Sequence, residues 1–398
     1  MTAPIEDKPK PAEVISLGCR LNISESERIG AMLAGEDIVV INSCAVTSEA
    51  VRQTRQAIRK ARRARPDARL LVTGCAADIE RDALVAMPEV DGLIANAGKL
   101  DPRMWNAPLD AAPVVPARTR AFVGVQNGCD HSCTFCVIPQ GRGVSRSLPV
   151  ADVLKVIERH LEQGAPEVVL TGVDLTSWGH DLPDAPGLGT LVQAILRAFP
   201  ALPRLRLSSV DGIEIDPLLF DVISSEQRIM PHLHLSLQHG HDLILKRMKR
   251  RHSRADAVDI VGRLKARRPE LSIGADLIAG FPTETDEHHA ANLSIIAELA
   301  VVHGHIFPYS PRSGTPAAHM PQVERAVVKG RAADLRAATS AQRGTWLESL
   351  LGTTQEVLAE RDGTGYAPNF ARVNVPAGTP AGTILTITPE HIEKGMLL

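Results

Sequence analysis

Three cysteines in one short loop are the residues in this 398-residue chain whose type and spacing most clearly suggest chemistry. Cys129, Cys133 and Cys136 follow the pattern Cys-x3-Cys-x2-Cys, and Phe135 stands directly before the last of them. Three thiolates on a short loop can hold three corners of a metal site and leave the fourth corner open. Four thiolates would complete an iron–sulfur cluster for electron transfer, whereas three leave one iron able to bind a substrate.

Other interpretations of this loop remain open at this point. Zinc is the main alternative, with His131 as a fourth ligand, although structural zinc sites usually contain two paired Cys-x2–4-Cys halves. A disulfide or unreactive buried thiols would be alternatives without chemistry. We favour the iron–sulfur cluster, because the thiols come as a set of three rather than as two pairs.

A second set of three cysteines lies within residues 13–100. Cys19, Cys44 and Cys75 each follow an apolar run that is typical of a strand, and a helical pattern follows each of them. This alternation predicts a small parallel sheet with flanking helices. Because the carboxyl ends of parallel strands share one edge of the sheet, we expect the three cysteines to converge there. A buried cysteine after one strand is common. Three cysteines at the same topological point indicate a second metal site in which the protein leaves one coordination position open.

The starts of two helices in this region can also be predicted. Ser24 and Glu27 match a capping box that precedes the apolar positions of the first helix. Thr47 or Ser48 is suited to cap the second helix.

Residues 121–345 alternate strand-like runs with helical patterns. The six runs cover residues 121–125, 167–171, 204–208, 232–237, 272–278 and 302–307. Six β/α units are too few for the eight-unit barrel, so we predict an α/β fold with an open (β/α)6 partial barrel. Its active site would lie at the carboxyl edge of the strands, where the loop of Cys129, Cys133 and Cys136 follows the first run.

Small polar residues stand at the ends of other predicted strands. Thr171 and Gly172 end one run, and Ser236 and Gln238 end another. Turns after strands favour such residues in any case, so each position alone is a weak signal. Their repetition at one edge predicts a site for a bound cofactor.

Four histidines lie in or just after the fourth run, at positions 232, 234, 239 and 241. A metal site is one interpretation of His232, His234, His239 and His241. Alternate residues of a strand share a face, so hydrogen-bonded core histidines are the other interpretation, and it is the one we favour.

Two segments are strongly basic. One is the helical segment 48–65, and the other is a short run after the fourth strand. Their basic residues are Arg52, Arg55, Arg59, Lys60, Arg62, Arg63 and Arg65, and Lys246, Arg247, Lys249, Arg250 and Arg251. A solvated surface is the simpler interpretation, and contact with RNA phosphates is the alternative.

The composition is that of an ordinary globular protein, with 44% hydrophobic and 23% charged residues. The formal net charge of −2 gives no overall attraction to nucleic acid, and 3% aromatic residues argue against a surface that stacks single strands. The first residues do not resemble a secretory signal, and no apolar run reaches the roughly 18 residues of a membrane span. We therefore expect a cytoplasmic protein without a membrane partner, whose six cysteines bind metal rather than form disulfides.

The pattern along the chain predicts five segments. Residues 1–12 form a flexible N-terminus, and the proline-rich residues 101–120 form a linker between the two cysteine sets. The small α/β domain covers residues 13–100 and the partial barrel residues 121–345. Residues 346–398 contain short β runs at 355–359, 371–375 and 383–388, punctuated by glycines, and form a small β domain.

The chain resembles the methylthiotransferase family of radical S-adenosylmethionine (SAM) enzymes over nearly its full length. The segments 17–22, 41–47 and 72–75 match the three cysteine motifs of the family's N-terminal domain, and residues 128–143 match its radical SAM loop. The six cysteines fall on the six ligand positions of the family. Residues 346–398 resemble its short RNA-binding TRAM domain.

Within this family, the chain looks most like the MtaB branch. The opening Leu-Gly-Cys-Arg-Leu-Asn of residues 17–22 and the segments 305–310 and 314–318 carry this likeness. The resemblance implies methylthiolation of carbon 2 of N6-threonylcarbamoyladenosine at tRNA position 37. The alternatives are methylthiolation of isopentenyladenosine in tRNA or of a ribosomal protein, and, in a different class, a zinc-stabilised RNA-binding module without catalysis.

The resemblance also implies the cofactors and their ligands. Cys129, Cys133 and Cys136 would hold the [4Fe-4S] cluster that cleaves SAM to a 5′-deoxyadenosyl radical. Cys19, Cys44 and Cys75 would hold an auxiliary [4Fe-4S] cluster that carries the sulfur.

Two SAM molecules would be used per turnover, and no catalytic residue beyond the cluster ligands is implied. Phe135 would pack near the adenine of SAM. The implied partners are the anticodon stem-loop of tRNA and an electron donor such as flavodoxin or ferredoxin, and we expect a monomer.

Overall fold

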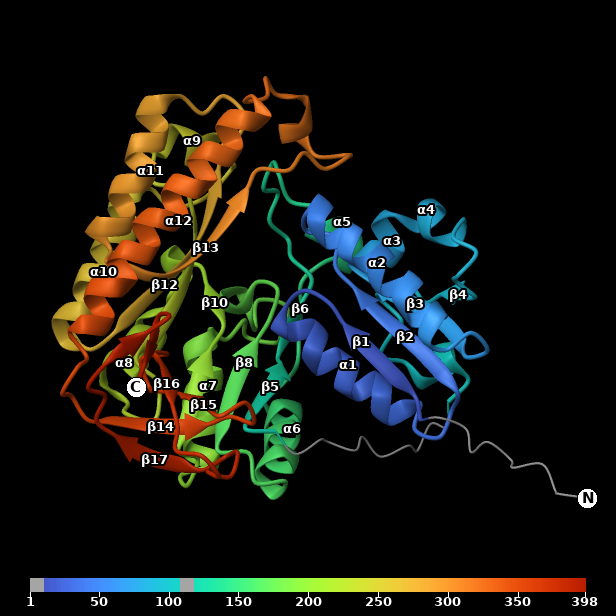
Figure 1. Cartoon of the computed structure of the whole chain (residues 1–398), viewed down its shortest axis with the longest axis horizontal. Helices are drawn as coiled ribbons and strands as arrows, with labels where there is room; N and C mark the ends of the chain where they lie inside the picture. Colours follow the sequence, from blue (N-terminus) through green and yellow to red (C-terminus); the bar gives the residue numbers. More distant parts are fainter. Residues whose placement is uncertain (1–10, 108–117) are drawn as a thin grey trace, which may run out of the picture. The chain divides into compact units, whose positions relative to one another are not determined.

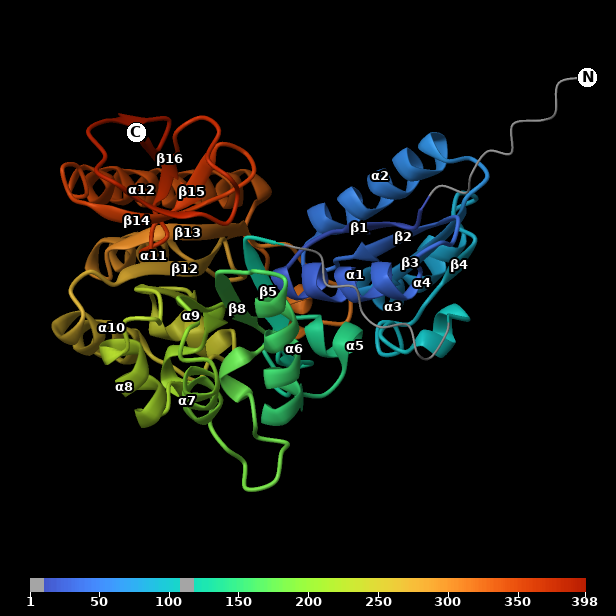
Figure 2. The same cartoon turned by 90° about the horizontal axis from the view of Figure 1, so that it is seen from below.

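The computed structural model describes residues 11–107 and 118–398. Most of the predicted flexible N-terminus, residues 1–10, and half of the predicted linker, residues 108–117, lie outside the described residues. Within the rest of the predicted linker, Pro102–Trp105 form a 3-10 turn and Arg120 begins a strand. The chain divides into two compact units (Figure 1 and Figure 2). The first contains the described residues 11–107 together with Gly128–Asp130 and Cys136–Val144, and the second contains the other described residues.

The first unit is built on a four-stranded parallel sheet in the order β1-β2-β3-β4. The strands are β1 (Glu13–Ser16), β2 (Ile38–Ser43), β3 (Arg69–Gly74) and β4 (Gly92–Leu93). The helices are α1 (Arg20–Met32), α2 (Ser48–Ala64), α3 (Cys75–Ile79) and α4 (Arg81–Val85), with a 3-10 turn η1 (Pro102–Trp105). The predicted small parallel sheet with flanking helices is therefore confirmed.

The central strand β2 is buried on both faces, which agrees with the four consecutive apolar residues at 38–41. Val39 and Ile41 pack with residues of α2, whereas Ile38 and Val40 pack with residues of α1 and with Trp105. The sheet is thus covered by helices on both sides.

One of the two predicted helix caps is wrong. Helix α1 begins at Arg20 with Cys19 as its N-cap residue, so Ser24 lies inside the helix and forms no capping box. Only residues 17–19 separate β1 from α1, so the helix begins four residues before the predicted cap. Thr47 caps α2 as predicted, and its side chain accepts a hydrogen bond from the backbone N–H of Ala50.

The second unit contains the predicted open (β/α)6 partial barrel, which is confirmed. Its strands form two parallel sheets, β5-β8-β9 and β10-β11-β12-β13, and only Ser208 separates β9 from β10 along the chain. The strands are β5 (Arg120–Gly124), β8 (Glu167–Thr171), β9 (Arg204–Leu207), β10 (Ser209–Val210), β11 (His232–Gln238), β12 (Ser272–Ala279) and β13 (Val301–Pro308).

Helices follow these strands and cover one face of the sheets. They are α6 (Val150–Glu162), α7 (Leu188–Ala198), α8 (Pro217–Ser225), α9 (Asp242–Arg247), α10 (Arg254–Arg267), α11 (Asp286–Glu298) and α12 (Arg325–Glu348). Neighbouring helices pack side by side, as α7 with α8 and α11 with α12 (Figure 1). Leu233, Leu235 and Leu237 of β11 pack in the core beneath the helices, so the alternate residues of β11 face away from them.

A small β sheet ends the second unit, in the order β17-β14-β15-β16-β19-β18. Its strands are β14 (Gln355–Ala359), β15 (Thr364–Tyr366), β16 (Arg372–Asn374), β17 (Ile384–Ile387), β18 (Ile392–Glu393) and β19 (Met396–Leu397). Strands β14, β16 and β17 lie at the predicted runs, whereas the shorter β15, β18 and β19 were not predicted.

This sheet is attached to the strands of the barrel by buried polar contacts. Arg206 pairs with Glu167 at 3.0 Å and also donates to the backbone oxygen of Pro368. Its guanidinium lies 4.8 Å from the ring centre of Phe370. Among the residues that the structure describes, none of the helices has the length and apolar character that crossing a membrane requires.

Candidate metal and cofactor sites

Cys19, Cys44 and Cys75 meet at the carboxyl edge of the sheet of the first unit. Cys19 precedes α1, Cys44 follows β2, and Cys75 is the first residue of α3. The loop that carries Cys19 lies very close to the loop that carries Cys44. A Cβ at Gly18 would lie 2.7 Å from the Cβ and 2.9 Å from the Sγ of Cys44. Burial raises the pKa of Cys44 to about 11, and the nearby thiols of Cys75 and Cys19 add to the rise.

Side-chain hydrogen bonds hold the three loops together. The amide of Asn22 donates to the backbone oxygens of Leu17 (2.6 Å) and Ser43 (3.0 Å), which joins the first two loops. The hydroxyl of Ser43 accepts from the N–H of Ala76 at 3.1 Å, which joins the second loop to the third. These hydrogen bonds hold the backbone of the three loops that carry Cys19, Cys44 and Cys75 in place.

The other cysteine set lies on the loop between β6 (Gln126–Asn127) and α5 (Ile138–Arg142), and its thiols are partly exposed. In the first unit, the N–H of Cys129 donates to the oxygen of Gly143 at 3.1 Å. A Cβ on Gly128 would lie 1.9 Å from the oxygen of Val144, so only glycine fits at 128. Cys136 and the helix α5 that follows it also belong to the first unit.

The middle of this loop, residues 131–135, belongs to the second unit. Thr134 donates to the backbone oxygen of Arg247 at 2.8 Å, and its own carbonyl accepts from Ala317 at 2.9 Å. The ring of Phe135 meets the ring of Phe281 edge to face, 6.3 Å between centres. The middle of the loop is thus anchored to the carboxyl edge of the barrel strands.

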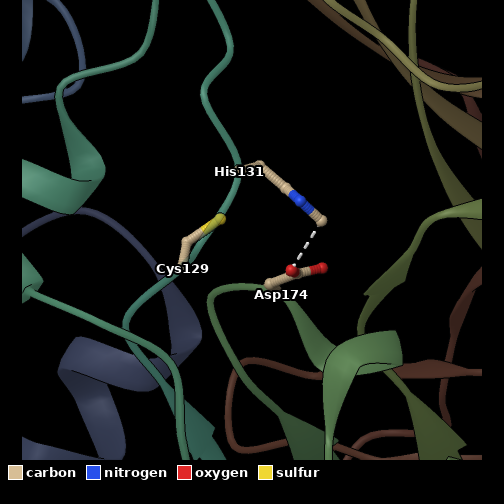
Figure 3. Close-up of side chains that lie close together, drawn as sticks. All are labelled: Cys129, His131 and Asp174. Carbon is tan, nitrogen blue, oxygen red and sulfur yellow. Dashed lines mark ion pairs between the residues drawn. The ribbon is translucent and has the colours of Figure 1, made fainter. Parts of the chain in front are cut away.

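A cluster of charged side chains surrounds this anchored segment. His131 pairs with Asp174, just beyond β8, at 2.8 Å; Figure 3 shows the two side chains pointing toward one another, with Cys129 on the same loop as His131. Hydrogen bonds to Asp174 and Glu214 raise the pKa of His131 to about 10. The residue considered as a fourth zinc ligand is therefore held in an ion pair.

Arg250 is the residue of this cluster nearest to a cysteine. Its guanidinium lies 3.7 Å from the Sγ of Cys133 and donates to Asp211 (2.7 Å) and to the backbone oxygen of Ser236 (2.9 Å). Its side chain is only 8% exposed. The structure thus gives Arg250 a place beside the cysteine loop rather than on the surface predicted for the basic run.

The predicted cofactor residues lie at this same edge. Thr171 and Gly172 end β8, and Ser236 and Gln238 end β11. The side-chain oxygen of Gln126 shapes the first of these turns, because it accepts from the N–H groups of Val173 (3.0 Å) and Asp174 (2.9 Å). A Cβ on Gly172 would lie 2.9 Å from that oxygen, so a larger residue at 172 would displace the side chain of Gln126.

Comparison with known proteins identifies the family. Residues 123–293 match the radical SAM superfamily, and residues 12–95 match the uncharacterized protein family UPF0004. The threonylcarbamoyladenosine tRNA methylthiotransferase MtaB of Rickettsia prowazekii is 42% identical, over 97% of this chain and 96% of its own. The chain belongs to the MtaB family of methylthiotransferases.

Other relatives are more distant. The MtaB protein of Bacillus subtilis is 33% identical over 77% of this chain and 74% of its own. A tRNA-2-methylthio-N(6)-dimethylallyladenosine synthase of Erythrobacter litoralis is 32% identical over 89% of this chain and 87% of its own. Among solved structures, the radical SAM methyltransferase TsrM of Kitasatospora setae shares the fold, with a TM-score of 0.52 and 16% identity over 74% of this chain and 66% of its own.

In this MtaB-family chain, three of the arginines predicted to contact RNA on α2 have acidic neighbours. Arg52 pairs with Glu49 at 2.5 Å, Arg55 lies 3.6 Å from Glu80, and Arg59 lies 3.8 Å from Glu89. These side chains are at least 40% exposed. They remain accessible to a phosphate, but their charge is partly balanced within the unit.

Some residues of the second basic run lie on the surface, whereas others lie beside the cysteine loop. Lys246, Lys249 and Arg251 are exposed, and Arg251 pairs with Glu214 at 2.5 Å. Arg247 is partly buried and donates to the hydroxyl of Thr283 at 2.8 Å.

The four histidines around β11 do not converge on one point. His239 pairs with the buried Glu284 at 3.2 Å, and His241 caps α9. His234 instead lies 3.0 Å from Asp276, whose other histidine neighbour is His305 at 3.2 Å. Hydrogen-bonded histidines, the interpretation we favoured, describe His234 and His239.

The sequence analysis missed the carboxylates at the barrel edge. Asp174, Asp211 and Glu214 come within a few residues of the ends of β8 and β10. The signal was available for Asp174, which stands two residues after Gly172 in a segment that was already singled out. Asp211 and Glu214 follow the polar strand end at Ser208 and Ser209 in the same way.

Proposed function

We propose that this chain is a tRNA methylthiotransferase that attaches a methylthio group to carbon 2 of N6-threonylcarbamoyladenosine at position 37, next to the anticodon. The observation that carries the proposal is 42% identity to an MtaB protein over 97% of the chain. Two separate sets of three cysteines support it, because one cluster explains how a radical is made but not where the sulfur comes from.

The thiols suit two [4Fe-4S] clusters, each with three protein ligands and one open iron. Cys129, Cys133 and Cys136 would hold the cluster that binds SAM. Cys19, Cys44 and Cys75 would hold the auxiliary cluster. When bound, the clusters and two SAM molecules supply a 5′-deoxyadenosyl radical, a sulfur atom and a methyl group.

The side chains around the loop orient these groups. Arg250 donates toward Cys133 and is itself held by Asp211, so it fixes this thiolate and balances its charge. Phe135, Phe281 and Tyr309 form an aromatic cluster at the same edge, with 5.5 Å between the rings of Phe281 and Tyr309. This cluster offers an apolar surface for the adenine of SAM and excludes water from it.

The inner face of the barrel sheet favours a polar substituent on the adenosine. Asp276 and His234 lie on the strand face turned away from the helices, and His305 beside them is 61% exposed. The threonylcarbamoyl group brings a carboxylate and a hydroxyl that an imidazole can bind, whereas an isopentenyl group would desolvate these side chains without replacing their hydrogen bonds.

The proposed partners follow from this reaction. The tRNA anticodon stem-loop is the substrate, and a flavodoxin or ferredoxin supplies the electrons. The exposed Lys246, Lys249 and Arg251 are candidates for phosphate contacts, as are Arg52, Arg55 and Arg59. The enzyme acts as a monomer in the cytoplasm.

The test is turnover by the anaerobically purified, reconstituted protein. Three substrates are offered separately: tRNA that contains N6-threonylcarbamoyladenosine, tRNA that contains isopentenyladenosine, and ribosomal protein. Mass spectrometry should find the added methylthio group only in the first. Modification of either of the other substrates alone would assign a different target, and a colourless protein that holds zinc and modifies nothing would contradict catalysis altogether.

A further inference from the structure

A buried group of charged side chains lies in the first unit, beside the cysteines at 19, 44 and 75. The Nζ of Lys99 is 2.5 Å from Glu25, and the guanidinium of Arg142 is 3.0 Å from the other oxygen of the same carboxylate. The three side chains are between 1% and 3% exposed. Two cations thus share one carboxylate, and the buried side-chain oxygens of Asn42 and Asn22 accept further hydrogen bonds from Lys99 and Arg142.

A surplus positive charge is costly to bury unless a negative group accompanies it. The nearest candidates are the thiols. Burial raises the pKa of Cys75, and the charges of Arg142 and Lys99 oppose the rise. Arg142 also donates to the side-chain oxygen of Asn22, which in turn accepts a weak hydrogen bond from Cys19 at 3.8 Å.

Arg142 reaches this position from the other cysteine loop. It is the last residue of α5, six positions after Cys136, and this segment belongs to the first unit. A Cβ on Gly141 would lie 3.3 Å from both the Cα and the Cβ of Cys75, so α5 packs directly against Cys75. The backbone oxygen of Gly141 also accepts a hydrogen bond from the amide of Asn96.

We propose that Arg142 is a positioning residue for the auxiliary cluster and that its guanidinium, held in place by Glu25, supplies the counter-charge of the cluster bound by Cys19, Cys44 and Cys75. An oxidised [4Fe-4S] core with three thiolates carries a net charge of about −1, which the surplus charge of the Arg142–Glu25–Lys99 group matches in size and sign. Because Arg142 follows Cys136, the segment that ends one cysteine loop also completes the surroundings of the other cysteine set. This inference rests on the proposed function only in assuming that the auxiliary cluster is present.

The test compares variants of the full-length protein, purified and reconstituted without oxygen. Arg142→Gln removes the charge, Arg142→Lys keeps it, and Arg146→Gln is the control at an exposed arginine nearby. We expect iron to fall from about eight to about four atoms per chain in Arg142→Gln alone. SAM cleavage in the absence of tRNA should persist in all three variants, because the other cluster is retained.

A second variant separates the charge from the docking of α5. Lys99→Met removes a cation but leaves the contact of Arg142 with Glu25 and the packing of Gly141 in place. It is combined with Cys129→Ala, Cys133→Ala and Cys136→Ala, so that only the auxiliary cluster contributes to the spectrum. Its midpoint potential should become more negative than in the triple-alanine parent, because a positive charge near the cluster favours the reduced form.

Full iron content in Arg142→Gln, together with an unchanged potential in the Lys99→Met variant, would overturn the proposal. Equal loss of iron in Arg142→Gln and Arg142→Lys with an unchanged Lys99→Met potential would also overturn it, because Arg142 would then only hold α5 in place. Both readouts are independent of tRNA. A wild-type protein that holds about eight irons but fails to modify tRNA would contradict the proposed function and leave this test intact.

Discussion

At the level of single residues, Gly18 shows what the auxiliary site demands of the chain. Its φ of +93° lies in the region that favours glycine, and its Cα faces the side chain of Cys44 at a distance that leaves no room for a methyl group. Residues of this kind position the thiols, which we propose are the ligands of the auxiliary cluster.

Replacing Gly18 with alanine should therefore disrupt the auxiliary site. The added Cβ would lie 2.7 Å from the Cβ of Cys44, and the backbone conformation would also be strained. We expect iron to fall to about four atoms per chain while SAM cleavage continues. Gly262→Ala in α10 is the matched control, since a Cβ there meets no atom within 4 Å; equal iron content in the two variants would show that the close approach is unimportant.

Removing a single ligand of the auxiliary cluster should separate SAM cleavage from methylthiolation. Cys44→Ala is expected to abolish methylthiolation but to retain SAM cleavage, because the loop of Cys133 is untouched. Cys133→Ala should abolish both activities. The products are measured as modified nucleoside and 5′-deoxyadenosine, and a Cys44→Ala protein that still methylthiolates tRNA would rule out the sulfur-carrying role.

His305 is expected to contribute to substrate choice. Its Nδ1 is oriented by Asp276, and its side chain is 61% exposed. His305→Leu should lower kcat/KM for tRNA that contains N6-threonylcarbamoyladenosine by about tenfold or more, the value of one hydrogen bond to a charged group. SAM cleavage without tRNA should be unchanged, and His391→Leu at an exposed C-terminal position is the control; an unaffected kcat/KM in His305→Leu would exclude this contact.

At the level of secondary structure, much of the fold could be predicted because apolar residues recur in each strand, consecutively in β5 and β8 and at alternate positions in β9 and β11. The six central runs became β5, β8, β9 with β10, β11, β12 and β13. The place of Arg250 could not be predicted in this way. Lys249 adopts a left-handed φ of +56°, which reverses the chain after α9 and turns Arg250 toward Cys133; a lysine gives no sequence signal for such a turn.

Helix α6 allows a prediction about pH. Burial, reinforced by Arg118, lowers the pKa of His160 to about 4, so its imidazole is neutral in the folded state at pH values where the unfolded chain, with a pKa near 6.5, already binds a proton. Stability from this residue is complete above pH 6.5 and is lost as pH falls from 6.5 toward 4. The loss between pH 7.5 and 5.5 should be about 1 kcal/mol.

This dependence is measured as the thermal unfolding midpoint under anaerobic conditions. His160→Leu, which keeps the buried face of α6 apolar, should weaken the fall of the midpoint between pH 7.5 and 5.5. His391→Leu, the control, should leave the fall of the midpoint unchanged. Parallel pH profiles for His160→Leu and wild type would mean that His160 does not contribute to acid sensitivity.

At the level of the whole molecule, the sequence predicts that the two cysteine sets lie in separate segments, residues 13–100 and 121–345. What the sequence could not show is that the loop of Cys129, Cys133 and Cys136 is shared between the two compact units. Cys129 and Cys136 belong to the first unit and Cys133 to the second. Apolar periodicity identifies elements, but the packing of α5 against Cys75 depends on a single glycine, Gly141.

The measurement that tests the central claim most directly is mass spectrometry of tRNA nucleosides from a strain that lacks this gene. We predict that 2-methylthio-N6-threonylcarbamoyladenosine disappears and its unmethylthiolated precursor accumulates. The wild-type gene should restore the modified nucleoside, and neither Cys44→Ala nor Cys133→Ala should do so. Persistence of the modified nucleoside in the deletion strain, or its restoration by either cysteine variant, would contradict the account.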